Sequence, residues 1–157
     1  MNGNLTLRRM RPGEEGRLWE VLRSAVLKGT AEHYDDAQRK AWAPSKPEIS
    51  WPARLSVDAC FVALLDTLVV GFMAADEHGH IDLAYVLPDM KNSGIGTRLL
   101  ERIEGEMQLN GVRRLTTDAS LVAQPFFERR GWTSGRTETV TRNGQSLRRV
   151  KMHKNLT

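Results

Sequence analysis

Residues 86–100 read Val-Leu-Pro-Asp-Met-Lys-Asn-Ser-Gly-Ile-Gly-Thr-Arg-Leu-Leu. This stretch predicts a strand that ends at Pro88, a loop that contains Gly94 and Gly96, and a helix that begins at once. Glycines let the backbone turn tightly and come close to a ligand, and the first turn of a helix leaves N–H groups without acceptors. The loop is therefore suited to bind a phosphate or pyrophosphate group.

A Gly-x-Gly pair before a helix is not specific by itself, because capping turns also use glycine for purely structural reasons. Two better-known nucleotide motifs do not fit the loop. A P-loop requires Gly-Lys-Ser or Gly-Lys-Thr, whereas residues 96–98 are Gly-Thr-Arg. A Rossmann fingerprint requires a further glycine at the position of Leu99. The rest of the chain must therefore decide what the loop binds.

Hydrophobic patterning around the loop predicts a mixed α/β protein. Strands are expected at residues 5–8, 60–65, 69–75, 81–86 and 115–119, and helices at about 18–29, 35–43, 96–110 and 122–130. Asp35 can cap the second helix. Residues 44–52 hold three prolines and are expected to form a surface loop. Asn143-Gly144 suits a tight turn with positive φ, so a final hairpin is expected at 133–141 and 146–154.

The chain has 157 residues, so we expect a single domain over residues 1–157. Its hydrophobic content of 40% excludes a fully disordered chain. The one cysteine, Cys60, excludes an internal disulfide and a four-cysteine zinc site. The apolar run at residues 60–65 is too short to span a bilayer. No apolar signal core follows Met1, so a cytoplasmic location is the default expectation.

The net charge of +4 is concentrated near the end of the chain. The basic residues there are Arg129, Arg130, Arg136, Arg142, Arg148, Arg149, Lys151 and Lys154, opposed only by Glu128 and Glu138. Such a segment is either a solvated strand face or a surface for nucleic acid, a membrane or a phosphorylated small molecule. Aromatic residues do not alternate with these cations as they do in single-strand binders, so nucleic acid is the least favoured partner.

Two segments resemble motifs of the GNAT superfamily of N-acetyltransferases. Residues 91–96 resemble its pyrophosphate motif Gln/Arg-x-x-Gly-x-Gly/Ala, with Lys91 as the cation in the first position. Residues 118–132 resemble its Asn/Ser-x-x-Ala-x-x-Phe-Tyr-x-x-x-Gly-Phe segment. The predicted order of elements follows the family over nearly the whole chain. The run Ala-Ser-x-x-Ala-x-Pro-Phe-Phe-Glu at 119–128 is similar to that of an uncharacterised bacterial subgroup.

The resemblance implies an acyl-CoA N-acyltransferase fold, in which a mixed, mostly antiparallel central sheet is flanked by helices. It implies acetyl-CoA as the acyl donor, without a metal, between the ends of strands 81–86 and 115–119. The backbone of Tyr85 and Val86 is expected to bind the pantetheine arm, with the Val86 N–H polarising the thioester carbonyl. The remaining residues expected to contact the donor are Lys91, Asn92, Ser93, Gly94, Ile95, Gly96 and Thr97 at the pyrophosphate, and Ser120, Phe126 and Phe127 along its tail.

Acetyl transfer requires a neutral amine, so a general base is expected. Alternation along strand 81–86 places His80 and Asp82 on the same face as Ala84 and Val86, with Ile81, Leu83 and Tyr85 on the other. His80 and Asp82 are therefore the candidate bases, although either could have a purely structural role. Many relatives carry a tyrosine as general acid at the position of Phe127, and phenylalanine cannot donate a proton.

The amine acceptor is expected to bind near the first two helices, with His33, Tyr34 and Trp42 as candidate contacts; helix packing is the alternative for Trp42. His78 and His80 lack evident further ligands, so no metal site is expected.

The favoured function is transfer of acetyl to a primary amine of a small molecule or protein by direct attack in a ternary complex. The alternatives are a non-catalytic acyl-CoA sensor and, less favoured, a nucleic-acid module. A homodimer is possible because sheets of this kind can pair at their edges.

Overall fold

The computed structural model describes residues 3–157. Met1 and Asn2, which belong to the N-terminal segment without a predicted signal core, lie outside these residues. Seven strands in the described residues form one sheet, in the order β1-β2-β3-β4-β5-β7-β6. All neighbouring strands are antiparallel except β4 and β5, which are parallel. None of the helices in this part of the chain is long and apolar enough to cross a membrane.

Nearly all the expected elements are present. The strands are β1 (Leu5–Arg9), β2 (Ala59–Leu65), β3 (Leu68–Ala75), β4 (His80–Val86), β5 (Arg114–Ser120), β6 (Thr133–Arg142) and β7 (Gln145–Asn155). The helices are α1 (Glu15–Gly29), α2 (Asp36–Trp42), α3 (Trp51–Leu55), α4 (Ile95–Leu109) and α5 (Gln124–Glu128), with the 3-10 turn η1 (Pro88–Met90) before α4. The mixed α/β prediction is confirmed, and α5 is shorter than the expected helix over 122–130.

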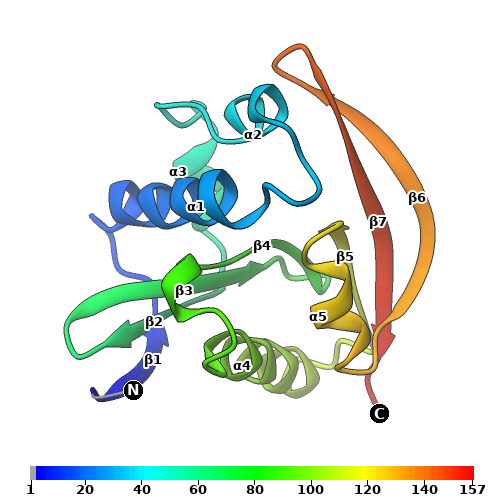
Figure 1. Cartoon of the computed structure of the whole chain (residues 1–157). Helices are drawn as coiled ribbons and strands as arrows, with labels where there is room; N and C mark the ends of the chain where they lie inside the picture. The colour runs from blue at the N-terminus through cyan, green and yellow to red at the C-terminus, as the bar shows by residue number, and fades with distance from the viewer. Residues whose placement is uncertain (1–2) are drawn as a thin grey trace.

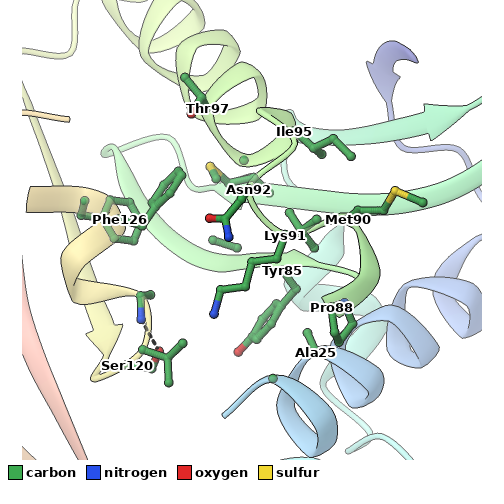
Figure 2. A pocket seen from close by; sticks show the side chains of 18 of the residues that line it. Ala25, Tyr85, Pro88, Met90, Lys91, Asn92, Ile95, Thr97, Ser120 and Phe126 are labelled. Atoms are coloured by element: carbon green, nitrogen blue, oxygen red, sulfur yellow. Dashed lines mark hydrogen bonds between the residues drawn. The ribbon is translucent and has the colours of Figure 1, made fainter. Parts of the chain in front are cut away.

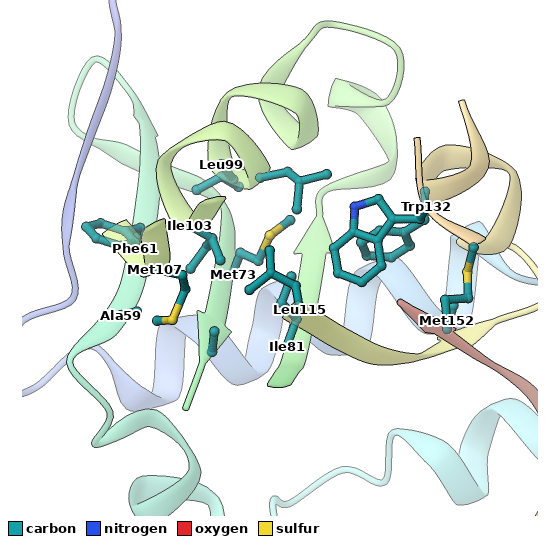
Figure 3. Packing of buried hydrophobic residues seen from close by; sticks show 14 of the residues in the cluster. Ala59, Phe61, Met73, Ile81, Leu99, Ile103, Met107, Leu115, Trp132 and Met152 are labelled. Atoms are coloured by element: carbon teal, nitrogen blue, oxygen red, sulfur yellow. The ribbon is translucent and has the colours of Figure 1, made fainter. Parts of the chain in front are cut away.

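Helices cover both faces of the sheet (Figure 1). On one face, the predicted apolar stripe of α4 packs against Phe61, Met73 and Leu115 (Figure 3). On the other face, α1 packs against Phe72 and Leu83. The expected cap of α2 is also present, since the Asp35 carboxylate accepts a hydrogen bond from the Gln38 N–H at 2.8 Å. These contacts hold the sheet between two apolar layers.

The prediction of a surface loop over residues 44–52 is wrong at its end. Trp51 begins α3 and is only 2% exposed. Its indole N–H donates to the Glu15 carbonyl at 2.8 Å, and its ring meets Trp19 edge-on, with centroids 5.0 Å apart. Pro52 does not prevent the helix, because a proline in the first turn removes only an N–H that has no partner there.

The predicted faces of β4 are confirmed for residues 83–86 and wrong for residues 80–82. Ala74 pairs with Leu83 and Ala75 pairs with Ile81, so Asp82 is an extra residue that shifts the register. This bulge reverses the alternation. Ile81 packs on the α4 side together with Ala84 and Val86, whereas Leu83 and Tyr85 pack on the α1 side. His80 and Asp82 line a cavity with Tyr85 instead of sharing the face of Val86.

Candidate active site

β4 and β5 lie side by side only where they begin. Their register includes two pairs, His80 with Thr116 and Ile81 with Thr117. At the last pair, the Thr117 hydroxyl donates to the Ile81 carbonyl at 2.8 Å. Beyond it the two strands separate, which leaves one edge of β4 from Asp82 to Val86 without a neighbouring strand. We call this opening the β4–β5 split.

The hydrogen bond that follows β4 fixes which N–H groups face the split. The Leu87 N–H donates to the Val70 carbonyl of β3 at 2.8 Å. In an antiparallel ladder, successive residues direct their N–H groups alternately toward and away from the partner strand. The register with β3 is regular from Leu83 to Val86. The N–H groups of Ala84 and Val86 therefore point away from β3 and into the split.

The start of α4 borders the same opening. Gly94 precedes the helix with φ +87°, a left-handed conformation that glycine adopts without strain. Arg98 donates the first intrahelical hydrogen bond, to the Gly94 carbonyl at 3.0 Å. The N–H groups of residues 95–97 come before that bond and have no helical acceptor, so the helix start can bind an anion. A Cβ on Gly96 would lie 3.0 Å from the Phe126 ring, so glycine permits close contact between α4 and α5.

A first cavity joins the split to the start of α4. Figure 2 shows Lys91, Asn92 and Tyr85 projecting into the space between α5 and the end of α1. All the predicted donor contacts except Ser93 line this cavity. Ser93 instead donates its hydroxyl proton to the Met90 carbonyl. Ser120 lines the cavity where its hydroxyl accepts a hydrogen bond from the Ala123 N–H at 3.0 Å.

Two further cations reach this cavity, Arg129 and Arg130. The Arg130 side chain donates to the Thr97 hydroxyl at 2.8 Å and lies over the Phe126 ring, 3.9 Å from its centroid. Sequence reasoning counted both arginines only as part of the basic end. The contact between Arg130 and Phe126 could have been predicted from their spacing of four residues, because residues four apart share one side of a helical turn.

The two neighbouring phenylalanines differ in position. Phe126 is partly buried beside α4, whereas Phe127 is 2% exposed and packs against Trp132, with ring centroids 4.9 Å apart. Phe127 is thus mainly a core residue with one edge at the cavity.

A second cavity lies on the α1–α3 side and shares Trp42, Tyr85 and Ser120 with the first. It brings together His80 and Asp82 of β4, Asp118 of β5, Arg54 of α3 and the β6–β7 hairpin. Tyr34 and Trp42 line it as well. His33 is exposed and lines neither cavity, so the structure separates it from the other two predicted acceptor contacts.

His80 lies between two side chains of β5. Its Nδ1 is 2.8 Å from the Thr116 hydroxyl, and its Nε2 is 3.7 Å from the Asp118 carboxylate. Asp118 also accepts a hydrogen bond from Lys151 at 3.1 Å. Asp118 was not predicted as a site residue. It lies two residues after Thr116, and this spacing places both side chains on the same face of β5, which could have indicated its position near His80.

Asp82 is engaged differently. Its carboxylate accepts two hydrogen bonds from Arg54, from Nε at 2.9 Å and from a terminal nitrogen at 3.3 Å. This ion pair connects β4 to α3. Arg54 was not a sequence candidate, because it lies just after the segment that was expected to be a loop.

The two tyrosines of the chain have distinct environments. The buried Tyr34 hydroxyl donates to the Arg148 carbonyl at 2.6 Å and accepts from the Leu121 N–H at 3.0 Å. The Tyr85 hydroxyl accepts from the Trp42 indole at 3.2 Å and, in the described chain, donates to no group. Burial raises the pKa of both hydroxyls above that of free tyrosine. Only Tyr85 therefore presents an uncommitted phenolic proton at the split.

The described residues contain no cluster of three or more His, Cys, Asp or Glu side chains able to hold a metal ion. A model of the acetyltransferase (GNAT) domain matches residues 30–156. The chain belongs to the GNAT family of acetyltransferases.

Similar proteins cover nearly the whole chain. The uncharacterized N-acetyltransferase YafP of Escherichia coli K12 is 31% identical over 141 residues, 90% of this chain and 89% of YafP. A crystal structure of a GCN5-related N-acetyltransferase from Rhodopseudomonas palustris has a TM-score of 0.91 and 32% identity, with 99% of each chain covered. The PaiA N-acetyltransferase of Thermoplasma acidophilum, solved with coenzyme A, has a TM-score of 0.73 and 16% identity, with 98% of this chain and 99% of PaiA covered.

These similarities confirm the predicted fold and the prediction of an N-acetyltransferase at the level of the family. The narrower resemblance of residues 119–128 to one bacterial subgroup stays a prediction.

Proposed function

We propose that the protein is an acetyl-CoA-dependent N-acetyltransferase that acetylates a primary amine of a small molecule or protein by direct attack in a ternary complex. One observation carries the proposal: the β4–β5 split exposes the N–H groups of Ala84 and Val86 beside the N-terminus of α4. The named complexes of PaiA with coenzyme A and of the Salmonella typhimurium YncA with acetyl-CoA support this choice of donor.

The first cavity has the chemistry that this donor requires. At its outer end, the N–H groups at the α4 start and the cations Lys91, Arg129 and Arg130 can bind phosphates. Its wall also includes apolar side chains, among them Ala25, Val122 and Phe126, which suit a pantetheine arm. When bound, the donor supplies a thioester-activated acetyl group.

We assign the steps around the split as follows. The Val86 N–H stabilises negative charge on the carbonyl oxygen. An amine that enters from the second cavity forms the new C–N bond as the C–S bond breaks. His80 accepts the proton that the amine loses, through water, because a neutral imidazole has one nitrogen that can bind a proton. Asp118 and Thr116 hold the ring, and Asp82 acts through Arg54 as a positioning residue instead of as the base.

The departing thiolate needs a proton that Phe127 cannot supply. Tyr85 lines both cavities, and its raised pKa keeps it protonated at neutral pH. We assign it as the proton donor. Tyr34 and Trp42 form a wall of the acceptor cavity, and His33 is not assigned a role. A cytoplasmic location and a homodimer stay predictions.

The test begins with a thermal-shift titration with acetyl-CoA beside 3′-dephospho-coenzyme A and ATP. We expect a saturable rise in Tm with acetyl-CoA, because a ligand stabilises the native state that binds it. Thiol release is then measured with a panel of amines. The one cysteine of the chain, Cys60, is buried and burial raises its pKa to about 12, so a thiol reagent reports free coenzyme A. Binding without amine-dependent thiol release would support the sensor alternative.

A further inference from the structure

The second cavity contains a positive charge that no carboxylate balances. Its charged lining residues are Arg54, Arg142, Arg148, Arg149, Asp82 and Asp118. Asp82 pairs with Arg54, and Arg149 pairs with Glu138 at 2.8 Å and with Asp118 at 3.6 Å. Within residues 3–157, no carboxylate lies within 4.0 Å of Arg142 or Arg148.

Strand register separates these two arginines. Arg148 pairs with Thr139 and alternates with the buried Leu147, so its exposed side chain lies on the outer face of the hairpin. Its backbone carbonyl is the part on the cavity side, where it accepts a hydrogen bond from the Tyr34 hydroxyl. Arg142 lies two residues after Val140, which pairs with Leu147, and therefore shares the face that lines the cavity. Arg142 is also half-buried. It is the unpaired cation directed into the acceptor side of the site.

Hydrogen bonds on either side of the hairpin turn hold the backbone next to Arg142. The Asn143 side chain donates to the Ala41 carbonyl at 2.7 Å, and Gln38 donates to the Ser146 carbonyl at 2.9 Å. These hydrogen bonds attach the turn to α2, beside which the tip of the hairpin lies (Figure 1). The backbone that carries Arg142 is therefore positioned before an anion binds, and only the arginine side chain loses conformational freedom on binding.

Arg142 lies close enough to the split to act on its residues. Burial raises the pKa of Tyr85, and the positive charges of Arg54 and Arg142 oppose that rise. The acidic side of the same cavity, Asp118 beside His80, lies on β5 and β4. The cavity thus offers a free cation on the hairpin and a carboxylate–imidazole pair on the central strands.

Building on the proposed function, we propose that the acceptor is an amino carboxylic acid whose carboxylate binds Arg142 while its amine lies toward His80. A planar guanidinium can donate two parallel hydrogen bonds to one carboxylate, which fixes orientation as well as charge. A simple alkylamine would leave this cation without an anion. The carboxylate therefore increases acetylation by aligning the amine with the split.

The experiment compares three amino acids with their decarboxylated amines: lysine with cadaverine, phenylalanine with phenethylamine, and histidine with histamine. kcat/KM is measured by thiol release with acetyl-CoA for the wild type and for Arg142→Gln, Arg142→Lys and Arg136→Gln. Arg136 is an exposed arginine of the same strand that lines neither cavity, so it serves as the matched control.

We expect the wild type to prefer the carboxylated member of its best pair by roughly tenfold or more, as a charge-assisted hydrogen bond gives. Arg142→Gln should bring the ratio close to one, Arg142→Lys should retain part of it, and Arg136→Gln should leave it unchanged. Equal kcat/KM within every pair, or a preference that survives in Arg142→Gln, overturns this inference alone. Absence of thiol release from all six amines, while another amine of the wider panel is acetylated, overturns this inference alone; absence from the whole panel, with acetyl-CoA binding intact, overturns the proposed function and this inference with it.

Discussion

The Arg54 side chain donates two hydrogen bonds to Asp82, the extra residue of the β4 bulge, the shorter of them at 2.9 Å. The pair connects the strand that borders the split to a helix outside the sheet. It also occupies the carboxylate that sequence alternation had made a candidate base. His80, which contacts Thr116 and Asp118 instead, is therefore our proposed proton acceptor.

His80 and Asp82 should therefore respond differently to substitution. His80→Ala should lower kcat by about 100-fold or more, the usual contribution of a general base, without changing acetyl-CoA affinity. Asp82→Asn should lower the free energy of unfolding by up to about 1 kcal/mol, because the pair is partly exposed, and should reduce kcat less. Steady-state kinetics and denaturant unfolding check both; a larger loss of kcat in Asp82→Asn would restore Asp82 as the base.

Tyr85→Phe removes the phenolic proton at the split and also the acceptor of the Trp42 indole. We expect kcat to fall by about tenfold or more, since general acid catalysis typically contributes 10²–10⁴-fold and a thiolate leaves tolerably without help. The KM for acetyl-CoA should change little. Thiol-release kinetics measure both quantities, and an unchanged kcat would exclude Tyr85 as the proton donor.

Gly94→Ala tests the loop before α4. A Cβ there meets no atom within 4 Å, so its cost is the left-handed backbone alone, about 1–2 kcal/mol. An alanine at this position can relieve its backbone strain only if the loop moves. Since the proposed phosphate-binding N–H groups follow this loop, the affinity for acetyl-CoA should also fall. Gly105→Ala is the matched control: it lies within α4, also meets no atom, and should stabilise the protein by about 0.5–1 kcal/mol without affecting the donor. Equal donor affinities in the two variants would contradict this role of the loop.

The pH dependence of stability has one clear contribution near the start of α1. The Arg8 side chain, which donates to Glu14 at 2.8 Å, holds the pKa of Glu14 below its usual value. A lowered pKa stabilises the fold above the pKa of the unfolded chain, and this contribution is lost as the pH falls. Glu14→Gln should cost roughly 0.5–1 kcal/mol at pH 7 and nothing at pH 2. Urea unfolding at both pH values measures this, and a difference that persists at pH 2 would contradict the assignment.

Local patterns predicted most of the fold because they act over a few residues. The Asn143-Gly144 turn, the Asp35 cap and the apolar stripe of α4 are confirmed, and each depends on neighbours along the chain. The bulge at Asp82 was not predictable, since it arises from pairing with β3 and leaves no mark in the alternation itself. Because of the bulge, His80 lines a cavity with Tyr85 instead of sharing the face of Val86.

In the candidate site, too, the residues that were predicted lie close together in sequence, and those that were missed do not. The loop before α4 was predicted because its glycines and the helix are adjacent in sequence. Arg54, Asp118 and Arg142 were not, because α3, β5 and the hairpin come together only in the folded chain. The indole of Trp51, buried against Trp19, places α3 and hence Arg54 in position.

We propose above all that acetyl-CoA binds in the β4–β5 split through the N–H groups that β3 leaves free. Amide hydrogen exchange, resolved residue by residue by NMR with and without acetyl-CoA, tests it most directly. The Leu87 N–H, already bonded to Val70, is the internal control. We predict that acetyl-CoA slows exchange at Ala84 and Val86 and leaves Leu87 little changed; saturating acetyl-CoA without protection at Ala84 or Val86 would contradict the account.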